Sequence, residues 1–378
     1  MNRPVFMDFE RRWAISGLED LTGHAGEAVL PKRDFLARLD ELSGRVEELG
    51  ERFGVALGLD HSVFMGRAAI LGLTRRGQTS CNGTCRLIES GDGWLAVNLA
   101  RPEDVDLVPA WLCRKGDDPW KAIGKTARRC STADLIERAA MLGMPVAAIP
   151  FSRHPGEGRD TDLSSQKRRL SRLDPGLRQD DGLEGGRRPV VVDLSSLWAG
   201  PLCGHLLTRI GCRVIKVEST TRPDGARFGP ATFFEELHNG QEFVTVDFAT
   251  PDRLRDLILS ADVVIEGSRP RALRQLGIDR DEVMSQRPSM TWVSITAHGR
   301  DDARVGFGDD AAAAAGLLAW DRAGRPVFVG DAIADPIAGL TAAEGAMASL
   351  LEGGGHTIDV SLSGAAAWVA DAPEIASW

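Results

Sequence analysis

Hydrophobic residues after position 190 occur in short runs separated by longer amphipathic segments. The runs at 190–192 and 214–217 are typical of buried strands, and the leucines between them recur at the spacing of a helix that ends at Gly211. Further strands are predicted at 244–248, 263–266, 291–295 and 357–362, and further helices at 251–260, with Thr250 as its N-cap, and 335–351. This alternation predicts an α/β fold with a Rossmann-like, mainly parallel sheet over residues 190–378.

The first 150 residues show a different pattern, which predicts a smaller α+β domain. Helical periodicity covers 27–53, and two strand-like runs on either side of Asp92-Gly93 predict a hairpin. The remaining predicted elements are helices at 104–113 and 132–142 and a strand at 144–149.

Residues 151–189 separate the two predicted domains. Charged residues, glycine and proline dominate this stretch, and apolar periodicity disappears. Such a composition cannot bury enough apolar surface to fold by itself, so we expect a disordered linker.

Composition narrows the possible functions. The net charge of −9 over 378 residues argues against a nucleic-acid-binding protein. We expect a cytoplasmic protein that does not enter the membrane, because no signal-peptide pattern and no run of about 18 apolar residues occurs. Cys81 and Cys85 have the spacing of half a metal site, but no second Cys or His pair accompanies them, so we expect reduced thiols and no metal.

The turn at Trp198-Ala199-Gly200-Pro201 is a candidate phosphate site, because it joins a predicted strand to a helix N-terminus. Gly200 and Gly204 do not complete the dinucleotide fingerprint GxGxxG, although Glu218 lies near the position of a ribose-binding acid. These residues alone leave open a structural βαβ unit, a nucleotide site and a nicotinamide-dependent oxidoreductase.

Asp335 precedes Pro336 at the start of a helix rich in alanine and glycine. Proline in the first turn favours Asp335 as an N-cap, and residue type alone favours that interpretation. The alternative is a nucleophile, because aspartate can form covalent acyl intermediates and small neighbours leave space for a substrate.

Five segments in this order resemble the class III CoA-transferase family, which includes formyl-CoA and carnitine CoA-transferases and α-methylacyl-CoA racemases. Together they extend over nearly all of residues 190–370. They are Val192-Asp193-Leu194 with Ala199-Gly200-Pro201; Gly211 with 214–218; Asn239-Gly240 with 246–248; 261–266 with Arg269-Pro270 and Leu276-Gly277; and Ala334-Asp335 to Gly339 with 353–355 and 358–362.

The first 150 residues resemble the smaller domain of the same family, notably at Asp92-Gly93-Trp94 and 142–147. In the usual family order this domain follows the nucleotide-binding half. The resemblance therefore implies a circularly permuted member in which 151–189 is the new connection. It also implies an interlocked homodimer or a partner subunit of the same family.

The resemblance implies that Asp335 is the catalytic nucleophile of a CoA-transferase and that acyl-CoA and a carboxylic acid are its substrates. CoA is then a substrate, and no tightly bound cofactor is expected. By the same resemblance, the residues expected to contact CoA are Ala199, Gly200, Pro201, Arg222, Arg227, Gln241, Glu266, Gly267, Ser268 and Arg269.

Three departures from the family pattern affect this interpretation. His238-Asn239-Gly240-Gln241 lacks two cations of the family's Asn-Arg-Gly-Lys, and Glu266-Gly267-Ser268 replaces Glu-Asn-Phe. The segment 306–310 also lacks the basic histidine of the racemases, which disfavours proton transfer by two bases. An acyl-CoA racemase or isomerase and a non-catalytic CoA-binding subunit remain as alternatives.

Overall fold

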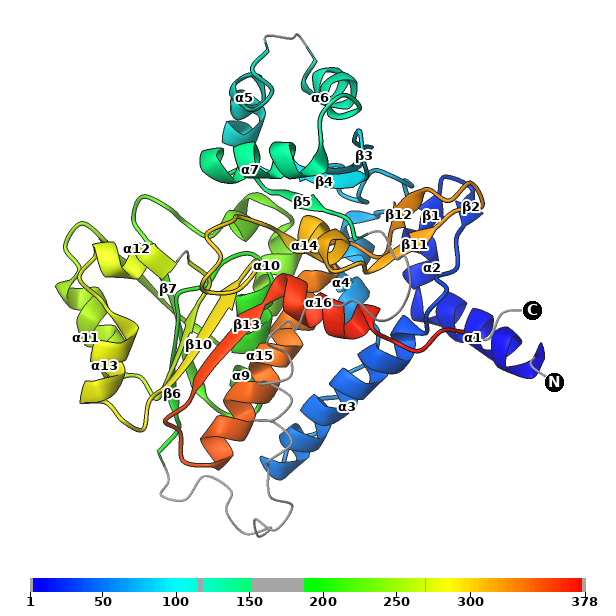
Figure 1. The fold of residues 1–378 in the computed structure, drawn as a ribbon. Helices are drawn as coiled ribbons and strands as arrows, with labels where there is room; N and C mark the ends of the chain where they lie inside the picture. Colours follow the sequence, from blue (N-terminus) through cyan, green and yellow to red (C-terminus); the bar gives the residue numbers. More distant parts are fainter. Residues whose placement is uncertain (1–2, 115–117, 151–186, 269, 376–378) are drawn as a thin grey trace.

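A six-stranded sheet forms the centre of the computed structural model, which describes residues 3–114, 118–150, 187–268 and 270–375 (Figure 1). Every neighbouring pair of its strands is parallel. In spatial order the strands are β13 (Thr357–Ser361), β10 (Thr291–Thr296), β9 (Val263–Glu266), β6 (Val190–Asp193), β7 (Arg213–Ser219) and β8 (Glu242–Val246).

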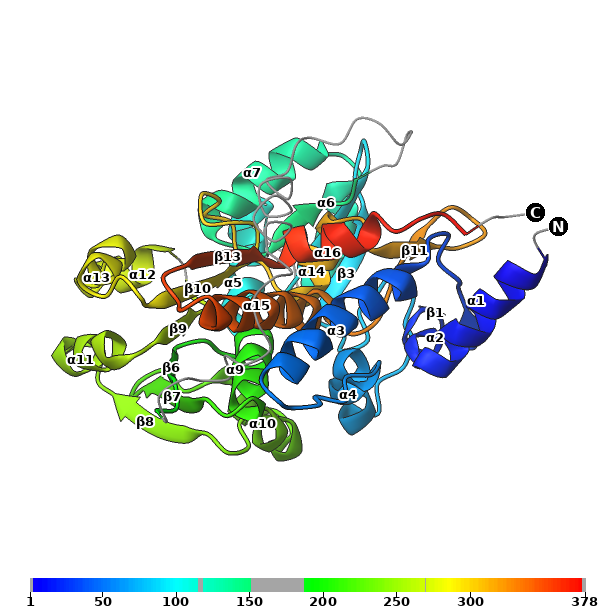
Figure 2. The ribbon, with the colours of Figure 1, turned by 90° about the horizontal axis from the view of Figure 1, so that it is seen from below.

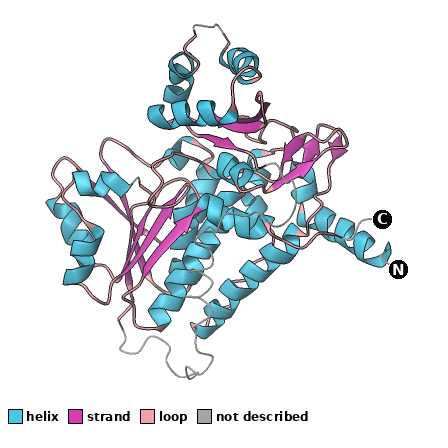
Figure 3. Cartoon of the chain, in the orientation of Figure 1, coloured by secondary structure: helices cyan, strands magenta, loops and turns pink. Residues whose placement is uncertain are grey.

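Both faces of this sheet are covered by helices (Figure 3). Because successive side chains of a strand point to opposite faces, Val191 and Ile265 belong to one hydrophobic core, and Val192 and Val264 belong to another. The first core is completed by α3 (Phe35–Arg52), α9 (Ala199–Arg209) and α15 (Ala334–Leu351). The second is completed by α11 (Asp252–Ser260), α12 (Pro270–Gln275) and α13 (Arg280–Gln286).

The N-terminal segment packs on the sheet domain. Figure 2 shows α3 running beside α15, and the guanidinium of Arg45 on α3 binds the Glu344 carboxylate on α15 at 2.7 Å. The core that contains α3 is the same one that contains α15. The other elements of this segment are α1 (Arg3–Ser16), α2 (Leu18–Leu21), β1 (Gly23–His24), β2 (Glu27–Ala28) and α4 (Ser62–Leu71).

A smaller layer with its own core follows. Its three antiparallel strands are β3 (Cys85–Glu89), β4 (Trp94–Asn98) and β5 (Val146–Ala148). They pack against α5 (Pro102–Trp111), α6 (Pro119–Ala127) and α7 (Thr132–Leu142). The first 150 residues thus contain two parts that pack differently, and their designation as one domain remains a proposal.

The remaining elements connect these layers. Helix α14 contacts β4, β5 and α16, so it joins the small sheet to the large one. The elements whose bounds have not yet been given are η1 (Gly225–Phe228), α10 (Ala231–Leu237), α14 (Gly308–Ala314), β11 (Leu318–Trp320), β12 (Pro326–Phe328) and α16 (Leu362–Ala370). No helix in the described ranges combines the length and apolarity needed to cross a lipid bilayer.

The predicted α/β class and the hairpin at Asp92-Gly93 are confirmed, whereas two helix starts were wrong. The helix predicted from residue 27 begins at Phe35, because the Asp34 carboxylate accepts the Ala37 N–H at 3.0 Å and caps it there. Thr250 does not cap α11: Pro251 flanks that helix, and the Thr250 hydroxyl instead donates to the Asp247 carbonyl. Helix α6 was not predicted, and most of the predicted linker, 151–186, lies outside the described residues.

Candidate active site

The direction of the strand connections reverses between β6 and β9. Connections run outward in opposite directions from these two neighbouring strands, and such a reversal point is where open α/β sheets bind ligands. Ser195, just after β6, packs against both Gly200 and Gly267, and a Cβ at Gly200 would overlap it. The predicted CoA contacts at 199–201 and 267–268 therefore meet at the carboxyl ends of these strands.

Asp335 lies in the first turn of α15, and the prediction that it caps the helix is wrong. Ile333 is the residue that flanks the helix, and the Asp335 N–H donates to the Ala332 carbonyl at 2.9 Å. The Asp335 carboxylate accepts no hydrogen bond from a described residue. It is partly exposed, and its place at a helix N-terminus favours negative charge.

Three further carboxylates surround it, and we call Asp309, Asp310, Asp331 and Asp335 the aspartate cluster. Burial raises the pKa of Asp335 to about 7; Arg67 opposes this rise, and the other three aspartates add to it. Burial likewise raises the pKa of Asp310 to about 7, and burial with the Asp331 charge raises that of Asp309 to about 6. The pKa values of Asp309, Asp310 and Asp335 are thus all raised toward neutral pH.

Polar side chains from the N-terminal half hold this cluster. The Arg67 guanidinium donates to both carboxylate oxygens of Asp331 at 2.8 and 2.7 Å. The Asn82 amide donates to Asp309 at 2.8 Å and to Asp331 at 3.3 Å. Asp309 in turn accepts the N–H of Ala332, whose φ of 44° is in the left-handed region that alanine rarely adopts.

Glycines bring the backbone close to Asp335 and to the Gly200 turn. A Cβ at Gly308 would overlap the Ala332 carbonyl and the Asp335 carboxylate, so only glycine fits there without movement. A Cβ at Gly339 would lie 2.7 Å from the Ala199 carbonyl, which shows how closely α15 crosses α9. The helix that begins beside the predicted nucleophile therefore packs against the start of α9, at the predicted CoA turn.

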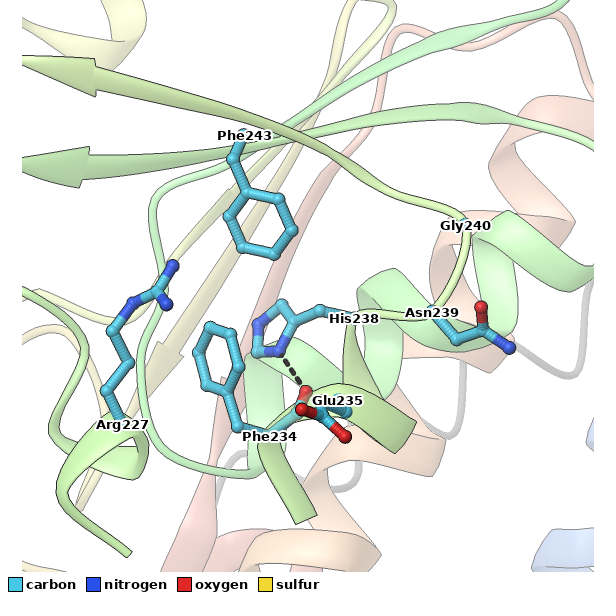
Figure 4. Close-up of a pocket in the computed structure, with 7 residues that line it drawn as sticks. All are labelled: Arg227, Phe234, Glu235, His238, Asn239, Gly240 and Phe243. Atoms are coloured by element: carbon cyan, nitrogen blue, oxygen red, sulfur yellow. Dashed lines mark hydrogen bonds between the residues drawn. The ribbon is translucent and has the colours of Figure 1, made fainter. Parts of the chain in front are cut away.

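Arg227 lines a pocket of about 480 Å³ beside α10 and β8 (Figure 4). Its guanidinium pairs with Glu218 at 2.6 Å and lies over the rings of Phe234 and Phe243, at 4.2 and 5.3 Å from their centroids. His238, which stacks on Phe234, also lines the pocket. A cation between aromatic faces beside a cavity is a suitable place for a planar or phosphorylated ligand.

The other predicted CoA contacts lie in different surroundings. Glu266 is buried and accepts hydrogen bonds from the Trp292 indole, the Ser294 hydroxyl and the Arg300 guanidinium, so protein groups already occupy its carboxylate. The Gln241 amide donates to the Leu237 carbonyl. Arg222 is exposed in the loop after β7. Arg269 lies outside the described residues.

Comparison with known proteins connects this geometry to a family. Residues 187–375, half of the chain, match CoA-transferase family III. The chain belongs to this family. The resemblance seen in the sequence is thereby confirmed for the second half, whereas the circular permutation remains a prediction.

Several family members are similar to this chain. The acyl-CoA transferase of Fusarium pseudograminearum is 29% identical over 199 residues, covering 46% of this chain and 44% of that protein. The succinyl-CoA:glutarate CoA-transferase of Mus musculus is 31% identical over 246 residues, 59% of this chain and 54% of that protein. The solved structure of Rv3272 from Mycobacterium tuberculosis is 29% identical, with a TM-score of 0.44, over 47% of this chain and 53% of that one. The chain spans about half the length of the curated relatives that it matches.

Sequence reasoning missed the residues that surround Asp335. Arg67 and Asn82 lie outside the segment that matches the family and far from Asp335 in sequence. A usable signal was present: Asp309, Asp310 and Asp331 interrupt otherwise apolar, glycine- and alanine-rich stretches. Charged residues in such surroundings are rarely buried without a function or a partner.

Proposed function

We propose that this family III member transfers CoA from an acyl-CoA to a carboxylic acid through covalent intermediates on Asp335. One observation carries the proposal: the Asp335 carboxylate has no hydrogen-bond partner among the described residues, and it lies at the start of the helix that packs against the Gly200 turn. A pKa of about 7 leaves roughly half of it ionised at neutral pH, and the anion is the nucleophilic form. Relatives named as CoA-transferases that use succinate, glutarate or D-citramalate support the reaction class.

The proposed chemistry consists of paired acyl transfers. A carboxylate oxygen of Asp335 attacks the thioester carbonyl of the donor, which forms a mixed anhydride and releases CoA as its thiolate. The thiolate attacks the aspartyl carbonyl, which releases the donor acid and leaves CoA as a thioester on Asp335. The acceptor carboxylate attacks this thioester, and the released thiolate then attacks the acceptor carbonyl of the new anhydride. The products are acceptor-CoA and free Asp335, so no group is gained or lost by the protein.

We place CoA along the carboxyl ends of β6 and β9. Residues 199–201 would approach it where they form the N-terminal turn of α9, and residues 267–268 where they follow β9. Arg222 and Arg227 are proposed to meet its phosphates, with the pocket in Figure 4 taking one end of the molecule. Pairing with Glu218 orients Arg227 but also reduces its free charge.

Oligomeric state belongs to the same proposal. Family resemblance favours a homodimer or a partner subunit, and one relative is the beta subunit of the succinyl-CoA–L-malate CoA-transferase of Chloroflexus aurantiacus, 31% identical over 193 residues. Light scattering of the purified chain, alone and with CoA, would give its mass. A monomer that binds CoA but does not react would favour a missing partner.

Covalent trapping tests the function directly. The protein is incubated with a panel of acyl-CoAs, reduced with borohydride and examined by intact mass and peptide mapping. We expect a modified residue 335 with at least one donor and no modification in Asp335→Asn, whereas Asp321→Asn, on the β11–β12 hairpin, should react normally.

The other outcomes separate the alternatives. CoA binding without any adduct would favour a non-catalytic subunit. Solvent deuterium incorporated at the α-carbon of an acyl-CoA, without an adduct, would favour a racemase or isomerase. Binding of NADH in place of CoA would contradict all three.

A further inference from the structure

One cation stands out in the surroundings of Asp335. Arg67 comes from α4, in the part of the chain that precedes the family match. Its side chain is 23% exposed, whereas Asp331, which it binds through two hydrogen bonds, is fully buried. Because two parallel N–H donors fix the guanidinium plane, Arg67 is held in one orientation.

The same guanidinium also contacts the Gly200 turn. Its central carbon lies 5.1 Å from the centroid of the Trp198 ring, and Trp198 is the residue immediately before α9. Arg67 therefore joins two loops, the one that leads into Asp335 and the one that leads into the predicted CoA turn. Its Nε and Nη2 atoms bind Asp331, and Nη1 donates to no described residue.

We propose that Arg67 is a positioning residue that holds the Asp335 carboxylate in its anionic form and fixes the loop that carries it. This rests on the proposed role of Asp335 as nucleophile. Burial opposes ionisation of Asp335, and so do the carboxylates of Asp309 and Asp310 on α14 and of Asp331 in the preceding loop when they are ionised. Arg67 acts against them, because its positive charge favours the ionised form of Asp335 and so lowers the pKa of that carboxyl.

The test is a titration of the Asp335 side chain in the full-length protein by carbon NMR of labelled aspartate. The signal is assigned by its loss in Asp335→Asn. In Arg67→Met, which removes the charge but keeps much of the bulk, we expect the titration midpoint to rise by about one pH unit or more. Asp331→Asn, which removes a negative neighbour and keeps Arg67, should lower the midpoint. The double variant should lie close to the wild type, because one charge of each sign is lost.

Two controls separate charge from structure. Arg67→Lys keeps the charge and should leave the midpoint closer to wild type than Arg67→Met does. Arg75→Met removes a part-buried arginine of the same segment, whose guanidinium donates to the Glu19 carbonyl and to no other described residue, and should leave the midpoint unchanged. If Arg67→Met does not fold, Asp331→Asn and the double variant still give the sign and size of the charge effect.

The rate of adduct formation gives a second readout. A midpoint raised by one unit should slow adduct formation in Arg67→Met about tenfold at pH 6 and leave it nearly unchanged at pH 9. An unchanged midpoint in folded Arg67→Met, or a midpoint that Asp331→Asn does not lower, would overturn the inference. If the wild type forms no adduct, the nucleophile proposal fails, yet the titration still decides the role of the Arg67 charge.

Discussion

Replacing Asp310 with asparagine should stabilise this protein more at pH 8 than at pH 5. Asp310 is fully buried; the Asn98 amide and the Phe307 N–H donate to one of its oxygens, and the other oxygen has no donor in the described part of the chain. The Asn98 side-chain oxygen is also buried without a donor. An asparagine at 310 keeps the shape and supplies an N–H where a second negative oxygen now stands.

The size of the effect follows from the pKa. Burial raises the pKa of Asp310 from its ordinary value of 3.8 to about 7, so between these values the folded protein keeps a proton that the unfolded chain releases. Stability therefore falls as the pH rises through this window, and the loss is complete above pH 7. At about 1.4 kcal/mol per pKa unit the loss is on the order of 2–4 kcal/mol. Asparagine does not titrate, so the variant avoids this loss.

Urea unfolding followed by circular dichroism at pH 5 and pH 8 measures the difference. We expect the free energy of unfolding of Asp310→Asn to exceed that of the wild type by about 2 kcal/mol or more at pH 8 relative to the difference at pH 5. Asp279→Asn is the control: backbone hydrogen bonds from Glu282 and Asp281 lower the pKa of Asp279 below its ordinary value of 3.8, so its effect should not change over this range. A difference for Asp310→Asn that is equal at both pH values, or larger at pH 5, would refute the reasoning.

Three further predictions concern packing and binding. Gly339→Ala places a Cβ against a main-chain oxygen of α9 and should lower the free energy of unfolding, measured with heat or urea, by about 1–3 kcal/mol. Gly44→Ala is the control, because a Cβ there enters open space on α3 and should not destabilise the protein. Arg45→Met leaves the buried Glu344 carboxylate unpaired and should cost about 1–3 kcal/mol by urea unfolding; no loss would mean that this ion pair does not hold α3 to α15. Arg227→Met should weaken CoA binding about tenfold by calorimetry and reduce its salt dependence, and unchanged affinity would contradict the proposed phosphate contact.

Much of the fold could be predicted from the sequence because its signals are local. The parallel strands are short apolar runs that are buried on both faces, so their periodicity identifies them without a partner. The hairpin at Asp92-Gly93 follows from turn chemistry and two flanking runs. Helix starts were less certain, because Asp34 and Thr250 are both acceptable caps by residue type and only Asp34 forms the bond.

The candidate site was only half predictable. Asp335 and the Gly200 turn could be found because their family motif is contiguous in sequence. The charges that govern Asp335 could not, since Arg67 and Asn82 reach the site from more than two hundred positions away. The surroundings of Glu266 were also invisible in the sequence: Trp292, Ser294 and Arg300 donate hydrogen bonds to its carboxylate, and its contact with CoA stays a prediction.

By itself the sequence determined the order of the parallel strands and the family of the second half, and it led to the proposal of Asp335 as nucleophile, because each depends on residues close together in the chain. Only the tertiary structure decided the ionisation of Asp335, the contact between α15 and the Gly200 turn, and the burial of Asp310. Solvation and charge depend on which atoms meet in space, and here those atoms come from both halves of the chain.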